Sequence, residues 1–483
     1  MSGITPTPPR PDESDLDIEK NGKDEAMLRK EITGSPNSSS ETLEMGEIEQ
    51  YPTKHEPITK TASNIARKVL TKISTKHSYI DPGPPPDGGF KAWLQCGCGC
   101  LVVATTWGFI NSFGMFQQYY VTFLDRPASD IAWIGSLQVF FLFFLGTFSG
   151  RLADAGYFKQ VVFVGSVMQL LGLCMASIST KYWHFILAQG ICVGIGNGCL
   201  FCPGVALVAT YFSTKKSLAI GISASGSALG GLIFPAMVQN LIPQIGFPWT
   251  MRAVALVDGL FLLFVNVFAK QRVPPRRNGQ ILDLASFKDK TYLFFGIAMF
   301  FTFWGLYVAF FLLAAFAREN VGFAGEESIN LVLVLNGVGL PGRVIPNYLA
   351  DRKTGPLNLI IFAACLSSVC MYCLTEVTSK AGIYVWAVAY GLVGAAVQSL
   401  FPATLGSLSS SDLSKSGVRI GMIFTIVSFA VLSGPPIAGA LVEKGQGSYN
   451  FAWIFAGSSI MVGTCFHALA RFHTTGFVLF HKV

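Results

Sequence analysis

Residues 150–154 read Gly-Arg-Leu-Ala-Asp, and the last three of these residues return 197 positions later as Leu349-Ala350-Asp351. Each copy comes directly after a long apolar stretch. Three further pairs keep nearly the same offset and the same order, which indicates two copies of one unit of about 200 residues. These pairs are Trp107-Gly108 with Trp304-Gly305, Phe201-x-Pro203 with Phe401-Pro402, and Gly221 with Gly421.

The composition around these motifs is too apolar for a soluble protein. Of 483 residues, 51% are hydrophobic and only 13% are charged, against about 25% charged in an ordinary soluble domain. Residues 1–86 hold 11 basic and 14 acidic side chains, which leaves 24 basic and 14 acidic ones in the other 397 residues. This pattern excludes a soluble multidomain protein and indicates a polar tail followed by a membrane-embedded body.

Twelve apolar stretches follow residue 93. A helix that crosses a bilayer needs about 20 mostly apolar residues, and helices satisfy their own backbone polar groups in lipid. We therefore predict an all-α integral membrane protein with twelve transmembrane helices in two six-helix pseudo-repeats. The predicted limits are 94–119, 130–150, 160–179, 184–209, 217–239, 249–269, 291–316, 328–350, 357–375, 381–405, 417–440 and 450–472.

The domain organisation follows from these limits. Residues 1–86 are rich in Pro, Ser, Thr, Glu and Lys and predict a disordered cytosolic tail. Residues 87–270 form the predicted N-terminal six-helix half and residues 291–475 the C-terminal half, with a cytosolic linker at 271–290 and a cytosolic C-terminus at 476–483.

The basic residues of the short loops predict the orientation. With the tail inside, the inner loops and the C-terminus hold about fifteen Lys/Arg and the outer loops about six, and cytoplasmic loops carry the excess of basic residues. We expect a multi-pass protein of the cell membrane with both termini cytoplasmic; a vacuolar or other internal membrane stays open.

A duplicated helical body is typical of a transporter. Two parallel six-helix halves place a substrate site near the membrane midplane between them. We therefore expect a small-molecule substrate and the lipid bilayer as partners, no enzymatic activity and no nucleic-acid partner. The eleven cysteines lie within predicted spans and the six histidines are scattered, so we expect no metal site, no cofactor and no disulfide framework.

The duplicated loop residues predict a gate. Glycine lets two helices approach closely, and a carboxylate beside a helix start is electrostatically favoured. A simpler interpretation is that these charges only hold helix ends together. The predicted gating residues are Gly150, Arg151 and Asp154 in the first half, and Asp351 and Arg352 in the second.

The Gly150-x-Leu152-Ala153-Asp154 sequence and its second copy resemble the loop signature of the major facilitator superfamily. Two further motifs resemble its monocarboxylate porter family, and the long tail is similar to fungal members. The resemblance covers about residues 87–475 and implies secondary transport by alternating access, without ATP. The motif residues are Asp87, Gly88, Gly89 and Trp93 in the first motif, and Tyr211, Phe212, Lys215, Lys216 and Gly221 in the second.

The resemblance does not decide the substrate. Animal monocarboxylate members pair a span-1 lysine with a span-8 aspartate and arginine to couple a proton to the carboxylate. Arg343 matches the arginine position, whereas Asn111 and Gly339 occupy the lysine and aspartate positions. These two differences argue against lactate-type proton symport. Fungal relatives are associated with riboflavin-like vitamins, carboxylates or the export of secondary metabolites.

Polar residues within the spans are the candidate substrate contacts, because a charge in the membrane faces the bundle interior. The Arg343 guanidinium suits a carboxylate or phosphate, although a structural hydrogen bond to helix carbonyls would also explain it. Asp258 is the candidate proton carrier, or else the partner of Arg252. The other candidate substrate contacts are Asn111, Tyr307, Asn197, Gln398 and Trp304.

Three functions stay open at this point. The first is a secondary active or facilitative transporter of a small organic anion or metabolite, with or without protons. The second is an efflux carrier for a secondary metabolite made by a biosynthetic gene cluster. The third, from a different class, is a transporter-like nutrient sensor that signals through the tail. The sequence identifies no accessory protein.

Overall fold

The computed structural model describes residues 83–274, 284–408 and 416–476. The chain divides into units 1–75 and 76–483, and every described residue belongs to the second unit. The predicted tail up to residue 82, the middle of the predicted linker and residues 477–483 lie outside the described residues. The described part of the chain is helical and contains no strand.

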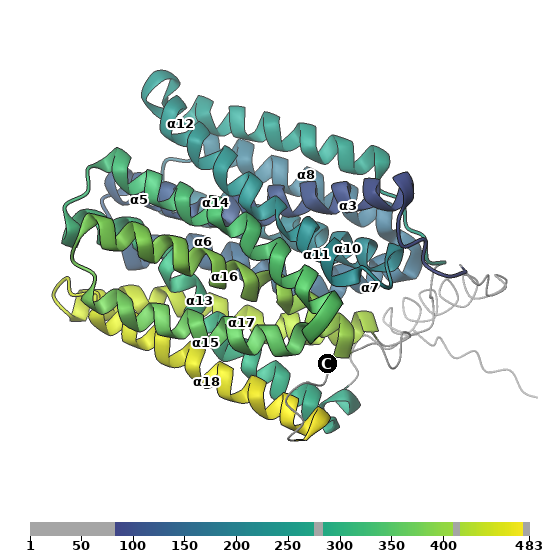
Figure 1. Cartoon of the computed structure of the whole chain (residues 1–483). Coiled ribbons are helices and arrows are strands. Elements are labelled where there is room, and N and C mark those ends of the chain that lie inside the picture. The colour runs from purple at the N-terminus through teal and green to yellow at the C-terminus, as the bar shows by residue number, and fades with distance from the viewer. Residues whose placement is uncertain (1–82, 275–283, 409–415, 477–483) are drawn as a thin grey trace, which may run out of the picture. The chain divides into compact units, whose positions relative to one another are not determined.

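The first set of helices, α3 to α12, precedes the predicted linker (Figure 1). Several are joined end to end by short π-helical segments, labelled η. The elements are α3 Gly89–Val103, η2 Ala104–Gly108, α4 Phe109–Asn111, α5 Phe113–Leu124, α6 Ala128–Phe144, α7 Gly146–Leu152, η3 Ala153–Tyr157, α8 Phe158–Ser177, α9 Tyr182–Phe185, η4 Ile186–Val193, α10 Gly194–Tyr211, α11 Lys216–Ala224 and α12 Gly226–Phe268.

The second set, α13 to α18, follows the predicted linker. Its helices are less interrupted than those of the first set. The elements are the 3-10 turn η5 Leu284–Lys288, α13 Lys290–Val321, α14 Gly325–Leu349, η6 Ala350–Thr354, α15 Pro356–Cys373, η7 Leu374–Glu376, α16 Lys380–Leu408, α17 Ser416–Lys444 and α18 Asn450–Thr475.

Nine helical stretches among the described residues are long and apolar enough to cross a membrane. Two of them, Ala128–Ser177 and Lys216–Phe268, each contain one glycine with left-handed backbone, Gly156 (φ 99°) and Gly246 (φ 74°). Glycine adopts this conformation without the strain that a side chain would bring. The chain can therefore reverse direction at both positions.

Contacts with α3 show the reversal within Lys216–Phe268. Near the start of this stretch, the Cys96 thiol donates to the carbonyl of Ala219 at 3.4 Å, and at its end the Gln95 amide donates to the carbonyl of Phe268 at 3.1 Å. The two ends therefore lie beside the same turn of α3. With both interrupted stretches taken as helix pairs and the 25-residue α14 included, the helices are consistent with the twelve predicted spans.

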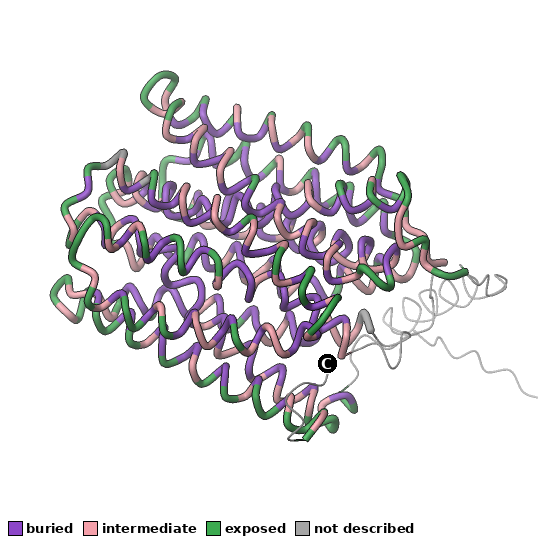
Figure 2. Tube along the Cα trace, in the orientation of Figure 1, coloured by how far each residue is buried: buried purple, intermediate pink, exposed green. Residues whose placement is uncertain are grey.

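Large apolar side chains face outward along the helices. Phe163, Leu260 and Val385 are 61%, 59% and 70% exposed, and Figure 2 shows buried residues along the helix faces that meet inside the bundle. A soluble protein rarely exposes so much apolar surface. The exposed surface therefore suits the acyl chains of a bilayer, as the composition predicts.

Glycines allow the first span to pack closely on α12. A side chain at Gly230 would place its Cβ 2.3 Å from the carbonyl oxygen of Ala104 and 2.8 Å from the Cα of Gly108. Small residues at such crossings bring two backbones into direct contact, which drives helix association in membranes. The glycine of the first Trp-Gly pair is thus needed for packing.

The two sets contact each other along several helix pairs, and two of these pairs involve the duplicated glycines. On one side, α7 contacts α17, where the Thr147 hydroxyl donates to the Gly421 carbonyl at 2.6 Å and lies 2.7 Å from the Thr425 hydroxyl. On the other side, α11 packs on α14, where a Cβ on Gly221 would lie 2.7 Å from the carbonyl oxygen of Arg343. Both duplicated glycines, 221 and 421, therefore lie at the interface between the sets.

Replacement of Gly230 by alanine should destabilise the protein, because the new methyl group overlaps backbone atoms that cannot move aside. Overpacking of this kind costs about 1–3 kcal/mol, so the purified G230A variant should melt at a lower temperature in detergent. Gly97 on α3 has no atom within 4 Å of a built Cβ, and Gly97→Ala is the matched control. Equal melting temperatures for both variants would contradict this packing.

Candidate substrate-binding site

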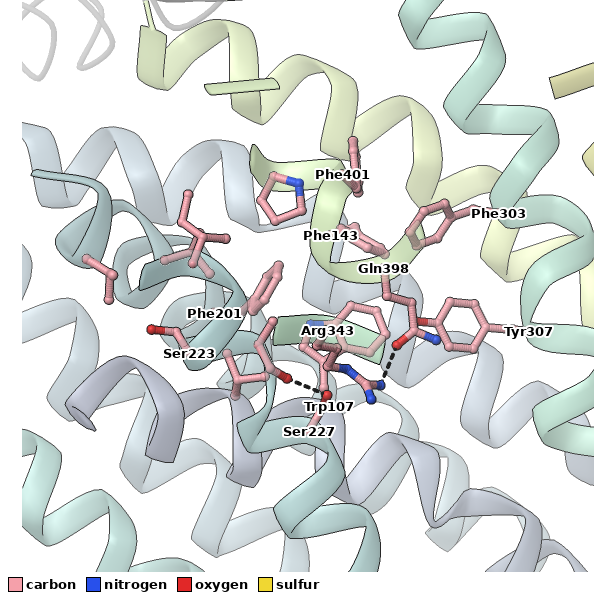
Figure 3. A pocket seen from close by; sticks show the side chains of 16 residues that line it. Trp107, Phe143, Phe201, Ser223, Ser227, Phe303, Tyr307, Arg343, Gln398 and Phe401 are labelled. Carbon is pink, nitrogen blue, oxygen red and sulfur yellow. Dashed lines mark hydrogen bonds between the residues drawn. The ribbon is translucent and has the colours of Figure 1, made fainter. Parts of the chain in front are cut away.

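A cavity lies between the two sets of helices, with an empty volume of about 530 Å³. The first set contributes residues of α3, η2, α6, α10, α11 and α12, and the second contributes residues of α13, α14 and α16 (Figure 3). A site between the sets is where the sequence predicts a substrate.

Six of the sixteen residues that line the cavity are aromatic. The Trp107 indole stacks on the Tyr307 ring at 5.5 Å between centroids and 16° between planes, so one ring from each set meets at the centre. Trp107 also contacts Phe143 at 5.3 Å, and Phe303 contacts Phe401 at 5.1 Å. Such walls favour a planar or aromatic ligand, because rings stack on it or meet it edge to face.

Arg343 projects into this wall from α14. Its side chain is buried, with 1% exposure, and its Nη2 donates to the Oε1 of Gln398 on α16 at 2.8 Å. Its Nη1 has no hydrogen-bond partner among the described residues. A buried guanidinium with an unused donor is costly unless an anion or another acceptor approaches it.

Two neutral donors accompany the guanidinium. The Tyr307 hydroxyl and the Gln398 Nε2 also lie buried without a partner in the described chain, and both residues line the cavity. No described lining residue is acidic. The arrangement therefore presents one positive charge and two further donors, which suits an anionic or acceptor-rich group.

The absence of a side chain at Gly339 makes room for Arg343. A Cβ built on Gly339 would lie 2.4 Å from Nη1 of Arg343, so the guanidinium occupies the space that a residue one turn earlier would fill. A side chain at the position that is acidic in animal monocarboxylate members would therefore have to displace the guanidinium. The cavity therefore retains an uncompensated cation.

The backbone carbonyl of Arg343 is held by the side chain of Asn347. Its Nδ2 donates to the Arg343 carbonyl at 2.7 Å and to the Ser399 hydroxyl on α16 at 2.8 Å. Gly221 of α11 packs directly on the same turn, because a Cβ there would lie 2.8 Å from the Asn347 Cβ. This motif glycine therefore connects the first set to the helix that carries the cation.

Residues 97–417 match the sequence profile of the family described as Major Facilitator Superfamily. The chain belongs to this superfamily. It is 48% identical over 393 residues to an MFS-type transporter of Gibberella zeae, which covers 81% of this chain and 89% of that protein. It is also 34% identical over 383 residues to the aspyridones efflux protein apdF of Emericella nidulans, covering 79% and 77% of the two chains.

The fold agrees with a solved transporter. The human organic anion transporter MFSD10 aligns with a TM-score of 0.59 over 78% of this chain and 98% of its own, at 14% identity. The predicted all-α superfamily fold is therefore confirmed. The family and its relatives also confirm the predicted function of a multi-pass membrane transporter.

Of the predicted substrate contacts, Arg343, Tyr307 and Gln398 come together in the cavity, whereas three others do not line it. Asn111 and Asn197 are buried in the first set, and all their amide atoms lack partners in the described chain. Trp304 donates its Nε1 to the Ser433 hydroxyl at 3.1 Å, away from the cavity. The two repeated tryptophans therefore have different surroundings.

Asp258 lies in α12 and does not line the cavity. It is 1% exposed, and neither carboxyl oxygen has a hydrogen-bond partner among the described residues. Arg252 contacts the Ser177 hydroxyl at 3.4 Å and lies 4.6 Å above the Trp249 ring. The structure thus forms no pair between Asp258 and Arg252.

Among the predicted gating residues, Asp351 links the two sets in this superfamily protein. Its Oδ1 accepts from the Ser217 backbone N–H at 3.1 Å and its Oδ2 from that of Leu218 at 2.7 Å. A carboxylate at these free N–H groups is favoured both by hydrogen bonding and by the helix dipole. Asp351, which follows α14, therefore caps the start of α11 in the other set.

The remaining gating candidates lie at corresponding turns. Gly150 in α7 packs on α10, where a Cβ would lie 2.9 Å from the Cys202 sulfur. Arg151 follows in α7 and Asp154 lies in η3. Arg352 lies 4.6 Å above the Tyr348 ring. The structure defines these positions, and their role in gating stays a prediction.

The two porter-type motifs contact each other. The Asp87 carboxylate accepts hydrogen bonds from the backbone N–H groups of Ser213 and Thr214 and from the Ser213 hydroxyl. Trp93 packs on Phe212 at 5.1 Å between ring centroids. Neither motif indicates this contact from its own sequence, because they are more than 110 residues apart.

The other motif residues surround this contact. Gly89 has a left-handed backbone (φ 79°) that starts α3, and Gly88 precedes it. The Tyr211 hydroxyl donates to the Lys270 carbonyl at 2.9 Å, which joins the end of α12 to the same cluster. Lys215 and Lys216 begin α11.

Sequence reasoning missed several cavity residues. Phe143, Phe201 and Phe401 supply much of the wall, and Ser223 and Ser227 add hydroxyl groups to it. Phenylalanines are common on lipid-facing and internal helix surfaces alike, so their type gave no signal. The two serines lie four residues apart on one helical face, which is the only pattern that could have indicated them.

The Asp87 contact predicts a pH-dependent stability. Slight burial alone would raise the pKa of Asp87, but hydrogen bonds from Ser213 and Thr214 outweigh it and hold that pKa below its ordinary value. A lowered native pKa adds stability above the unfolded-state pKa, and this stability is lost as the pH falls through the native pKa. Asp87→Asn should therefore melt at a lower temperature than the natural protein at pH 7.

The difference in melting temperature between the two proteins should shrink as the pH falls below about 4, the unfolded-state value. Thermal melts in detergent over a pH series measure it. Asp125 lies in the loop after α5 and does not share the hydrogen-bond partners of Asp87, Ser213 and Thr214, so Asp125→Asn serves as the control. A difference that is independent of pH would contradict the proposed ionic contribution of Asp87.

Proposed function

We propose that this transporter exports an aromatic organic anion across the cell membrane by alternating access, as a secondary active or facilitative carrier. One observation carries the proposal: Arg343, Tyr307 and Gln398 each present an unpartnered hydrogen-bond donor to a cavity lined by aromatic rings. A carboxylate would satisfy these donors, and a conjugated body would stack between Trp107 and the phenylalanines.

The relatives support the direction and the class of substrate. The similarity to a protein named for the efflux of aspyridones favours export of a secondary metabolite, and the fold of an organic anion transporter is compatible with an anionic substrate. The Asp87–Ser213 contact between both motifs supports membership of the monocarboxylate porter family. The proposal includes the cytoplasmic orientation of both termini that the loop charges predict.

The contacts between the two sets supply the moving parts of this proposal. Asp351 and α11 hold one end of the interface, which we assign to the cytoplasmic side. At the other end, the Phe113 ring packs on Phe311 at 5.1 Å, and a Cβ on Gly114 would lie 3.3 Å from the Phe310 carbonyl. Alternating access would break these two groups of contacts in turn, with the cavity between them.

Loss of Arg343 should reduce transport of an anionic substrate. A hydrogen bond to a charged group contributes about 1.5–3 kcal/mol, so Arg343→Ala should lower the export of aromatic carboxylates by about tenfold to 100-fold. The measurement is efflux from preloaded cells or proteoliposomes, normalised to protein in the membrane. Arg343→Lys should retain part of the activity, because it retains the charge.

Arg252→Ala is the matched control, because Arg252 also lies in a predicted span but does not line the cavity. Its efflux should match that of the natural protein. Efflux of every anionic substrate at the natural rate by Arg343→Ala, with equal protein in the membrane, would remove Arg343 from the site and refute the proposal.

Proton coupling through Asp258 is part of the proposal that needs its own test. A carboxyl group buried without a cation can hold a proton in one state and release it in another. If Asp258 carries the coupled proton, Asp258→Asn should make substrate flux insensitive to an imposed pH gradient while downhill flux continues. A gradient response equal to that of the natural protein would exclude Asp258 as the carrier.

A further inference from the structure

Three buried carboxamides in the first set leave all of their polar atoms unused. Asn111, Gln138 and Asn197 are at most 1% exposed, and the amide oxygen and nitrogen of each have no hydrogen-bond partner among the described residues. Burying amides in this way is costly. Six such atoms on three different helices therefore require an explanation.

Asn111 and Asn197 lie at the same level of the bundle. The first span runs antiparallel to α10, because Gly99 packs on Val208 and Gly204 packs on Val102. The contact between the Trp107 and Phe201 rings continues this register. Asn111 lies four residues after Trp107, and Asn197 lies four residues before Phe201. The same register therefore places the two asparagines opposite each other, about one helical turn from the two rings.

Gln138 of α6 joins the same layer. The Trp107 ring contacts Phe143, and Gly135 packs on the Phe113 ring, which places Gln138 level with Asn111. On the other side, a Cβ on Gly194 of α10 would lie 3.1 Å from the Cα of Gln138. Gly194 is three residues before Asn197, so the three carboxamides lie within a layer about one helical turn deep, on three helices of the first set.

This layer lies directly beyond the aromatic wall of the cavity. Trp107, Phe143 and Phe201 contact one another and line the cavity together with Arg343 (Figure 3), whereas none of the three carboxamides lines it. Beyond the layer, Phe113 packs on Phe311 of the second set. The carboxamides therefore lie between the cavity and the end of the bundle opposite Asp351, on the route that an exported molecule would take.

We propose that Asn111, Gln138 and Asn197 form a second subsite, which binds an uncharged group of the substrate that both donates and accepts hydrogen bonds. An amide, or a hydroxyl beside a carbonyl, has this character. Each carboxamide offers donors and an acceptor together, so a carboxylate or an ammonium group would leave part of the layer unsatisfied. The inference rests on the proposed function, because it takes the acid group of the substrate to be held by Arg343.

The substrate class follows from the two subsites. The transported molecule has an acid at one end, an aromatic or conjugated middle that passes the Trp107 wall, and a neutral polar group at the other end. The carboxamide layer would then determine specificity among aromatic acids, whereas Arg343 would bind all of them.

A matched pair of substrates tests this division. Cinnamate and 4-carbamoylcinnamate share the carboxylate and the conjugated ring, and only the second has a neutral amide. In proteoliposomes the natural protein should transport the carbamoyl compound about fivefold more efficiently, the factor of one neutral hydrogen bond. The double variant Asn111→Leu/Asn197→Leu should lose this preference, so that it transports the two compounds with about equal efficiency.

Melting temperature distinguishes this role from a structural one. Because the replaced amides have no partners in the described chain, the nearly isosteric leucines should leave the melting temperature unchanged or raise it. Gln169→Leu is the control, since the Gln169 Nε2 donates to the Thr105 carbonyl at 2.9 Å. This variant should melt earlier and keep the preference for the carbamoyl compound.

The outcomes separate the two proposals. With transport still lowered by Arg343→Ala, any of three results would overturn the second subsite alone. These are no preference in the natural protein, an equal loss of both substrates in the double variant, or a preference that the double variant retains. If Arg343→Ala transports both compounds at the natural rate, the proposed function fails, and the subsite inference falls with it.

Discussion

The cost of keeping one guanidinium inside an apolar bundle governs the centre of this structure. Arg343 is buried, and among the described residues its guanidinium has one side-chain hydrogen-bond partner, Gln398. In the membrane interior a charge loses hydration that water cannot replace. Space for the group comes from Gly339, and the position of its helix is fixed by Asn347 and Gly221. The cavity, its donors and the crossing of α11 over α14 are all arranged around this charge.

The same helix connects the charge to the contact between the two sets. Arg343 and Asp351 are eight residues apart, about 12 Å along a helix, and Asp351 holds the start of α11. A shift of α14 on binding an anion would therefore act directly on that contact, without a long chain of intermediates. Packed interfaces of this kind have discrete alternative arrangements, which is what alternating access requires.

The sequence predicted the helices, the superfamily fold and three residues of the cavity, because apolar length and isolated intramembrane polar residues are strong signals. It could not predict which side of the aromatic wall each polar residue occupies. Trp107 and Trp304 are equivalent in the repeat, yet only Trp107 lines the cavity, since the repeats have diverged in packing. Contacts between distant segments, such as Asp87 with Ser213, follow from the tertiary structure alone.

The missing lysine and aspartate of the animal relay have an electrostatic consequence. In a cavity with an acid beside the arginine, the empty carrier can close around a neutral pair. Here Gly339 leaves the guanidinium without a counter-charge among the described lining residues. Closing the empty cavity would bury an uncompensated cation, which is expensive, whereas closing it around an anion buries a pair. Return of the carrier should therefore be easier with an anion bound, and this favours exchange of anions over transport in one direction only.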